Sequence, residues 1–259
     1  MSSEIGDKTW IEVSGKYHHI TERKIAVLID GDNAQPDSLE PILTEVSKYG
    51  IINIKRIYGD WTTPQMSSWK QYLHKKAITP QQQFAYTTGK NSTDSSLIID
   101  AMDILHKGNI DGIAIVSSDS DYTRLATRFR EDNKFVMGIG RKQTPEAFTN
   151  ACELFVYVEN LMNPAENEKE NEIIETYEKQ EINDKGELFS LIRTAYEMAD
   201  TADGWVHLSL LNQNLQKIKS SFDPRTYSHK KLMNLIKKEC NEILETKTED
   251  TSVYVKLKN

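Results

Sequence analysis

The stretch KIAVLIDGDNA at residues 24–34 decides the fold class of this chain. It begins as a short apolar run of β type, ends that run at Asp30, and leads into a helical stretch that Pro36 opens and Gly50 follows. Strand-like segments and helix-like segments continue to alternate in this way up to residue 158. This alternation predicts parallel strands joined by helices in a three-layer, Rossmann-like α/β domain over residues 24–160. The predicted strands are 24–30, 51–58, 81–86, 112–118, 134–140 and 154–158, and the predicted helices are 36–48, 63–76, 94–106, 122–130 and 145–151.

The rest of the chain divides into three parts. Residues 1–23 fit no element well, and we expect a flexible tail there rather than an extra edge strand. Residues 161–187 are dense in charge, which is typical of a solvated helix or a flexible linker. Residues 188–259 show three helical segments followed by two short alternating strands. This order predicts a small winged helix–turn–helix domain, a class used for nucleic acid and protein contacts.

The composition is that of an ordinary globular protein, with 38% hydrophobic and 27% charged residues. No apolar run approaches the roughly 18 residues of a membrane span, and the first residues lack the basic-then-apolar order of a secretory signal. The net charge of −7 resides in residues 159–187, where 10 acidic residues face 3 basic ones, so it argues little against nucleic acid binding. Cys152 and Cys240 have no metal-ligand spacing and favour a reducing cytoplasm over a disulfide.

Four aspartates occupy special places in this predicted layout. Asp30 ends the first strand, Asp119 and Asp121 follow the fourth, and Asp94 begins the helix that leads into the fourth. In a doubly wound sheet of order 3-2-1-4-5, strands one and four are neighbours, and the crevice at their carboxyl ends is the default ligand site. We therefore predict that the four carboxylates meet at one edge of the sheet.

The chemistry of such a cluster points to a divalent metal. Close carboxylates repel one another and raise one another's pKa unless a cation neutralises them. Mg²⁺ and Mn²⁺ suit them because hard cations prefer oxygen ligands. A metal held there can generate hydroxide and stabilise a charged phosphorus centre, so the cluster predicts phosphodiester cleavage. Asn33 could orient a carboxylate or contact the substrate, and Lys90 could meet a phosphate.

Other interpretations of these residues stay open. An aspartate after a strand is often an N-cap, and Asp119 or Asp121 can cap the next helix. Arg124 and its neighbours on that helix form either a phosphate-attracting rim or a solvated face. The six histidines show no paired-ligand spacing, and the chain has neither a Walker lysine loop nor a G-x-G-x-x-G run. Three further aspartates are less favoured as ligands because of their positions along strand or helix: Asp32, Asp100 and Asp103.

The segments KIAVLIDGDNA, TTGKNSTDSSLIIDAMD and IAIVSSDSDYTRLATRFRE, in this order, resemble the NYN domain in its LabA-like subgroup, within the PIN-like nuclease superfamily. The resemblance covers residues 24–160 and implies a ribonuclease fold that depends on Mg²⁺ or Mn²⁺. On that pattern the four acidic positions are matched by Asp30, Asp94, Asp119 and Asp121. Asn33 matches the polar position after the first acid, and Ser118 matches the small residue before the third acid. The family often has glycine before the acidic pair or phenylalanine after it, where this chain has Ser118 and Tyr122; both changes leave the carboxylates intact.

The segments DGWVHLSLLNQNL, SFDPRTYSHKKLMNLIKK and SVYVKLK resemble a LOTUS (OST-HTH) domain over residues 188–259. The resemblance implies RNA or protein binding, with a solvated basic face as the alternative for its cationic residues. The candidate contacts are Lys217, Lys219, Arg225, His229, Lys230 and Lys231.

These observations together predict a cytoplasmic, metal-dependent ribonuclease. RNA is the expected partner, DNA is not excluded, a protein partner of the C-terminal domain is left open, and no membrane is expected. One alternative is a non-catalytic RNA-binding or scaffolding protein. Another is a haloacid-dehalogenase-type phosphatase with Asp30 and Asp32 as its D-x-D motif, although Ala34 stands where that family usually has threonine or valine.

Overall fold

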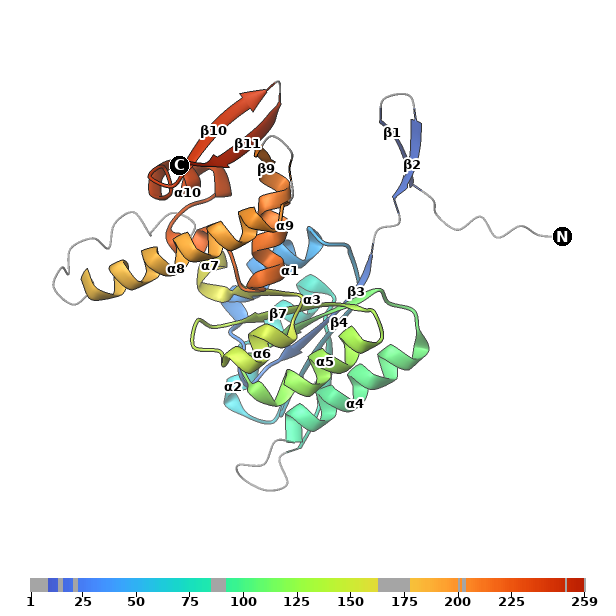
Figure 1. The fold of residues 1–259 in the computed structure, drawn as a ribbon. Coiled ribbons are helices and arrows are strands. Elements are labelled where there is room, and N and C mark those ends of the chain that lie inside the picture. Colours follow the sequence, from blue (N-terminus) through green and yellow to red (C-terminus); the bar gives the residue numbers. More distant parts are fainter. Residues whose placement is uncertain are drawn as a thin grey trace.

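A computed structural model describes residues 9–13, 16–20, 23–84, 92–162, 178–199, 201, 204–249 and 251–258, and of 9–13, 16–20 and 178–184 it describes the backbone alone (Figure 1). Lys90 and most of the acidic stretch 163–187 therefore lie outside the described side chains. Among the described residues, no helix has both the length and the apolar character that crossing a bilayer requires.

Six parallel strands form the central sheet, in the order β5-β4-β3-β6-β7-β8. In chain order this is 3-2-1-4-5-6, which confirms the predicted doubly wound α/β fold. The central strand β3 is buried on both faces, since its residues from Ile25 to Asp30 are at most 1% exposed. The strands are β3 (Lys24–Asp30), β4 (Ile51–Gly59), β5 (Thr79–Gln82), β6 (Gly112–Val116), β7 (Phe135–Gly140) and β8 (Leu154–Tyr157).

Helices cover both faces of this sheet, because alternate residues of a strand point to opposite faces. Ala26 and Leu28 of β3 pack with α4, α5 and α6, which Figure 1 shows in front of the sheet. Ile25, Val27 and Ile29 pack with α1, α2, α3 and α7 in a second core. The helices are α1 (Leu39–Ser47), α2 (Pro64–Ser67), α3 (Lys70–Lys76), α4 (Ser92–Lys107), α5 (Thr123–Glu131), α6 (Glu146–Ala151) and α7 (Val158–Met162), with 3₁₀ turns η1 (Pro36–Ser38) and η2 (Ser120–Tyr122).

Two predicted elements differ in detail. The single helix predicted over 63–76 is divided into α2 and α3, because the N–H groups of Trp69 and Tyr72 donate to carbonyls three residues back and tighten the chain there. Met66 and Trp69 are both buried at this division. The third strand, predicted over 81–86, ends at Gln82, since β5 pairs only with the last four residues of β4.

Within residues 1–23, two strands pair with each other in an antiparallel hairpin, β1 (Thr9–Val13) and β2 (Lys16–Ile20). Neither strand pairs with the six-stranded sheet among the described residues. The segment that we expected to be a tail therefore contains local β structure that does not extend the sheet.

The C-terminal domain has its own hydrophobic core, built from three helices and a small antiparallel sheet of order β10-β11-β9. This arrangement confirms the predicted small winged-helix domain. Cys240 is buried in this core and Cys152 in the core of the first domain, and both thiols are free. The elements are α8 (Glu178–Glu197), β9 (Val206–His207), α9 (Leu208–Ile218), η4 (Pro224–Tyr227), α10 (Leu232–Glu239), β10 (Leu244–Glu249) and β11 (Ser252–Leu257).

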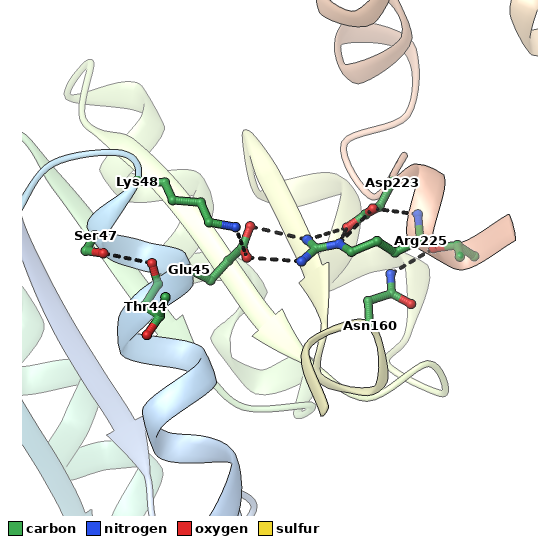
Figure 2. Close-up of polar contacts among 8 residues, drawn as sticks. Thr44, Glu45, Ser47, Lys48, Asn160, Asp223 and Arg225 are labelled. Carbon is green, nitrogen blue, oxygen red and sulfur yellow. Dashed lines mark hydrogen bonds and ion pairs between the residues drawn. The ribbon is translucent and has the colours of Figure 1, made fainter. Parts of the chain in front are cut away.

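An ion pair joins the two domains (Figure 2). The Arg225 guanidinium of η4 donates to both carboxylate oxygens of Glu45 in α1, at 3.1 and 3.2 Å, and is held from its own domain by Asp223 at 2.6 Å. Lys48 reaches the same Glu45 carboxylate at 2.7 Å. Glu45 is only 5% exposed, so this pair is largely removed from water.

Candidate functional site

The candidate site lies at the carboxyl edge of the sheet, where β3 and β6 run side by side. Asp30 is the last residue of β3, and Asp119 and Asp121 follow β6 within the turn that becomes η2. Gly31 carries the chain away from Asp30 so close to β4 that a Cβ atom there would lie 2.7 Å from the Tyr58 carbonyl oxygen. Asp94 enters the same region from the first turn of α4, where the positive end of the helix dipole favours a carboxylate.

Three carboxylates lie together at this edge. Asp94, Asp119 and Asp121 each present an oxygen within 4.8 Å of the others. Asp121 is exposed and the other two are partly exposed, so the group faces solvent. Asp119 is also the N-cap of η2, because its side chain accepts from the Asp121 N–H at 2.9 Å. Asp119 therefore caps η2 and also belongs to the carboxylate group. The hydrogen bond from the Asp121 N–H holds the Asp119 carboxylate in place near Asp94.

Asp30 lies behind this group and has no exposed surface. Its Oδ2 accepts from Asn33 Nδ2 at 2.7 Å, from Ser117 Oγ at 2.9 Å and from the Tyr122 hydroxyl at 3.3 Å, whereas its Oδ1 accepts from the Asp32 N–H at 3.1 Å. Burial raises the pKa of the Asp30 carboxyl above its usual value. The hydrogen bonds from Asn33 and Ser117 lower this pKa in part, and the nearby Asp94 raises it further.

Tyr122 connects Asp30 to the exposed group, and the sequence did not indicate this role. Its buried hydroxyl donates to Asp94 Oδ1 at 2.7 Å and lies 3.3 Å from Asp30 Oδ2. Burial and the adjacent carboxylates raise the pKa of Tyr122, which keeps the hydroxyl a neutral donor. Tyr122 is therefore more than a neutral replacement for the phenylalanine of the family pattern, because a phenylalanine has no group to bridge the two carboxylates.

The electrostatics of Asp94 follow the same logic. Its partial burial raises the pKa of the Asp94 carboxyl, the hydrogen bond from Tyr122 lowers it in part, and Asp119, Asp121 and Asp32 raise it again. Three neighbouring carboxylates therefore disfavour the charged form of Asp94 as long as no cation is present. Asp32, which the sequence disfavoured, lies near this group: its Oδ2 accepts from the hydroxyl of Thr93 at 2.8 Å.

The other residues predicted for this site differ in how directly they contact the carboxylates. Asn33 donates its side-chain amide to Asp30, so it lies where the sequence predicted. The Ser118 hydroxyl accepts from the Arg141 N–H at 2.9 Å, and its neighbour Ser117, which was not singled out, is the serine that contacts Asp30. Arg124 is exposed in the first turn of α5, immediately after the acidic turn.

Asp100 and Asp103 lie apart from the acidic group. Asp100 joins α4 to β4, because its carboxylate accepts from Arg56 and from the Tyr58 hydroxyl. Asp103 is an exposed residue of α4.

In the C-terminal domain, three predicted RNA contacts are engaged within the protein. Arg225 binds Glu45 and Asp223, Lys219 pairs with Glu187 at 2.7 Å, and His229 lies 3.2 Å from Glu239. Their partners come from a distant part of the sequence or from a neighbouring helix, so the sequence alone did not indicate these pairings. Three others remain exposed: Lys217, Lys230 and Lys231.

Known proteins share sequence or structural similarity with part of this chain. A curated relative, an uncharacterized protein of Methanocaldococcus jannaschii, is 30% identical over 125 residues, which cover 46% of this chain and 48% of the relative. The chain thus matches about half the length of that relative. A solved structure of a protein of unknown function from Vibrio parahaemolyticus aligns with 52% of this chain and 93% of its own, at 18% identity and a TM-score of 0.44.

Two family models match the chain. The OST-HTH/LOTUS domain matches residues 183–255, which include most of α8, all elements from β9 to β10 and the first part of β11. The NYN domain matches residues 24–159, which include the six-stranded sheet and the acidic edge and make up more than half of the chain. The protein therefore belongs to the NYN domain family and carries an OST-HTH/LOTUS domain after its NYN domain.

Proposed function

We propose that this protein is a divalent-metal-dependent ribonuclease that hydrolyses phosphodiester bonds in RNA, and that its C-terminal domain helps to bind the RNA. Membership of the NYN family supports a nuclease, and the OST-HTH/LOTUS domain supports an RNA substrate. One observation carries the proposal: Asp94, Asp119 and Asp121 present oxygens within 4.8 Å of one another at the carboxyl edge of a parallel sheet.

The donor set fits Mg²⁺ or Mn²⁺. All three groups are carboxylates, the hard ligands that these cations prefer, and two opposite oxygens in a Mg²⁺ shell are about 4.2 Å apart. Burial raises the pKa of Asp94 most, and the neighbouring carboxylates Asp119 and Asp121 raise it further, so a cation would relieve part of this cost. Asp94, Asp119 and Asp121 would hold the metal, with Asp30 as the fourth carboxylate of the site. When bound, such a metal supplies an acidified water and compensates the charge that develops on phosphorus.

The chain's own residues have distinct tasks in this proposal. Tyr122 and Asn33 fix the orientation of Asp30, so that its less occupied oxygen, Oδ1, is the one available to the site. Asn33 is exposed on its outer side and would contact the substrate. Arg124 lies one helical turn from Asp121 and would meet a phosphate there, and Ser118 and Lys90 complete the proposed substrate contacts. Lys230 and Lys231 would contact RNA from the C-terminal domain.

The phosphatase alternative is less well supported. It requires Asp30 to attack phosphorus as a nucleophile, yet Asp30 has no exposed surface and its Oδ2 is surrounded by three donors. A nucleophile needs an approach path to the reacting phosphorus atom, and this carboxylate is instead placed to support its neighbours.

The direct test is cleavage of labelled RNA. Wild type, Asp119→Asn and Asp103→Asn are incubated with single-stranded and structured RNA in Mn²⁺ and in EDTA. Asp103 is the matched control, because it is an exposed aspartate of α4 outside the acidic group. We expect cleavage by wild type and by the control, and a loss of more than about a hundredfold in Asp119→Asn and in EDTA. Equal cleavage by all three proteins would overturn the assignment of the activity to the acidic group, and cleavage by none would overturn the nuclease proposal itself.

A further inference from the structure

A cleft of about 890 Å³ separates the two domains on the side of the molecule away from the acidic group. Arg23 before β3, Phe135 at the start of β7 and Leu154 at the start of β8 line one wall, so the cleft lies at the amino edge of the sheet. The other wall is the end of α9 and the turn after it, from Gln213 to Ser220. A cleft of this size between domains is the usual setting of a ligand site.

The walls of this cleft are fixed relative to each other. Ser220 of the C-terminal domain accepts the Phe155 N–H at 3.0 Å through its carbonyl and donates its hydroxyl to the Thr149 carbonyl at 2.7 Å. Asn160 donates to the Thr226 hydroxyl at 2.9 Å, beside the pair of Arg225 and Glu45 (Figure 2). These contacts join the two domains that form the walls, and Ser220 itself lines the cleft, so a ligand would not have to assemble it.

Cations predominate among the charged residues of the cleft. Its lining includes Arg23, Arg130 and Lys217 but a single carboxylate, Glu153. Lys217 is exposed and forms no side-chain hydrogen bond or ion pair within the described part of the chain. Arg130 reaches the carbonyls of residues 150 and 151 only at 3.4 Å, the long limit of hydrogen bonding. Three cations against one carboxylate give the cleft an excess of positive charge, which favours an anion.

One of these cations also offers a flat surface. The Arg23 guanidinium lies over the Phe135 ring, 4.7 Å from its centroid, and Phe135 stacks in turn on Tyr49 at 5.8 Å. Phe135 is only 7% exposed, whereas Arg23 is exposed, so the outer face of the guanidinium is the surface open to a ligand. Guanidinium planes held in this way stack on the bases of single-stranded RNA.

We propose that the interdomain cleft binds a segment of single-stranded RNA, through phosphate contacts from Arg130 and Lys217 and base stacking on Arg23. The identity of the ligand rests on the proposed function, but the site is separate from the acidic group. β3 runs from Lys24, next to Arg23, to Asp30, and seven residues of strand span about 23 Å. At about 3.4 Å per stacked nucleotide, a strand that reaches both sites needs at least roughly seven nucleotides.

The experiment measures binding to the full chain in EDTA, so that cleavage does not interfere. Labelled single-stranded RNAs of 4, 8, 12 and 16 nucleotides are titrated by fluorescence anisotropy over a series of salt concentrations. The cleft variants are Lys217→Gln and Arg23→Gln/Lys217→Gln. The matched control is Lys70→Gln/Lys75→Gln, which removes two exposed charges of α3 instead. Lys217→Gln alone keeps the test valid if loss of Arg23 disturbs the packing on Phe135.

We expect wild type and control to bind 12 nucleotides at least tenfold more tightly than 4, and the double cleft variant to lose that advantage. Each phosphate contact contributes about 0.7 to the slope of log affinity against log salt for single strands, so the slope should fall by about 0.7 in Lys217→Gln. Cleft variants that match the control in affinity and slope would overturn the proposal. So would displacement of the RNA by micromolar adenosine monophosphate, because the cleft would then be a site for a free nucleotide.

The result is independent of catalysis. If neither wild type nor any variant cleaves RNA in Mn²⁺ but the cleft variants lose affinity for RNA in EDTA, the nuclease proposal is wrong and RNA binding in the cleft is supported. If the cleft variants bind normally while wild type cleaves and Asp119→Asn does not, the nuclease stands and the cleft proposal fails.

Discussion

Replacement of Arg225 by methionine tests whether charge holds the two domains together. Removing one partner of a buried ion pair costs about 3–5 kcal/mol, because the other charge is left without compensation. Here that charge is the Glu45 carboxylate, whose side chain is 6% exposed. Lys48 keeps part of the compensation, and the Arg225 side chain is 25% exposed. We therefore expect the free energy of unfolding to fall by about 2–3 kcal/mol, below the range for a fully buried pair.

The assay is equilibrium unfolding in urea, followed by circular dichroism, of four proteins that form a double-mutant cycle: wild type, Arg225→Met, Glu45→Gln and the double variant. The cycle isolates the interaction between the two side chains, and we expect a coupling energy of about 1.5–3 kcal/mol. Arg193→Met is the control, because Arg193 is exposed in α8. A coupling energy below about 0.5 kcal/mol, or an equal loss in the control, would refute the argument that this pair docks the domains.

Three further predictions concern the acidic edge. Mn²⁺ at a hundred times its dissociation constant should stabilise wild type by about 2.7 kcal/mol, seen as a higher melting temperature, and a shift of the same size in Asp119→Asn would remove that residue from the site. The pKa values of Asp30 and Asp94 are raised in the metal-free protein. Because the folded state holds these two protons more tightly than the unfolded state, protonation of the two carboxyls stabilises the fold. This stabilisation is fully present below the unfolded-state pKa of about 3.9 and is lost as the pH rises through the higher folded-state pKa values. The metal-free melting temperature should therefore decline less between pH 4 and pH 8 in Asp94→Asn than in wild type, and equal declines would contradict this assignment. Tyr122→Phe should fold, lose about 1–2 kcal/mol of unfolding free energy in EDTA because Asp94 loses its buried donor, and need more Mn²⁺ for the same melting shift. An unchanged Mn²⁺ titration would restrict Tyr122 to a packing role.

The general layout of the fold was predictable because it depends on local patterns. Apolar runs that alternate with amphipathic segments specify parallel strands and covering helices, and the order of a doubly wound sheet follows from few rules. The edge at which Asp30, Asp94, Asp119 and Asp121 occur follows from the same rules, because each residue stands at the end of a strand or the start of a helix. The division of the helix at Trp69 escaped this reasoning, since it depends on burial against the sheet rather than on helix propensity.

The contacts that complete the site were not predictable, because they join residues far apart in the chain. The Tyr122 hydroxyl meets Asp94 across 28 positions and Asp30 across 92. Ser117 rather than Ser118 faces Asp30 because successive residues of an extended chain point in opposite directions. Arg225, which the sequence presented as a candidate RNA contact, meets Glu45 across 180 positions. Each of these pairings needs the tertiary fold before it can be seen.

The contact between Phe155 and Ser220 also bears on self-association. An edge strand with open backbone groups can pair with the edge of another molecule, and proteins avoid this with short strands, prolines or a covering segment. Both edge strands of this sheet have four residues, and each has a further means of protection. β5 contains Pro80, which has no N–H to donate, whereas β8 gives the Phe155 N–H to the Ser220 carbonyl of the C-terminal domain. The C-terminal domain thus occupies the Phe155 N–H of the β8 edge, and this group is not open to pairing with a strand of another molecule.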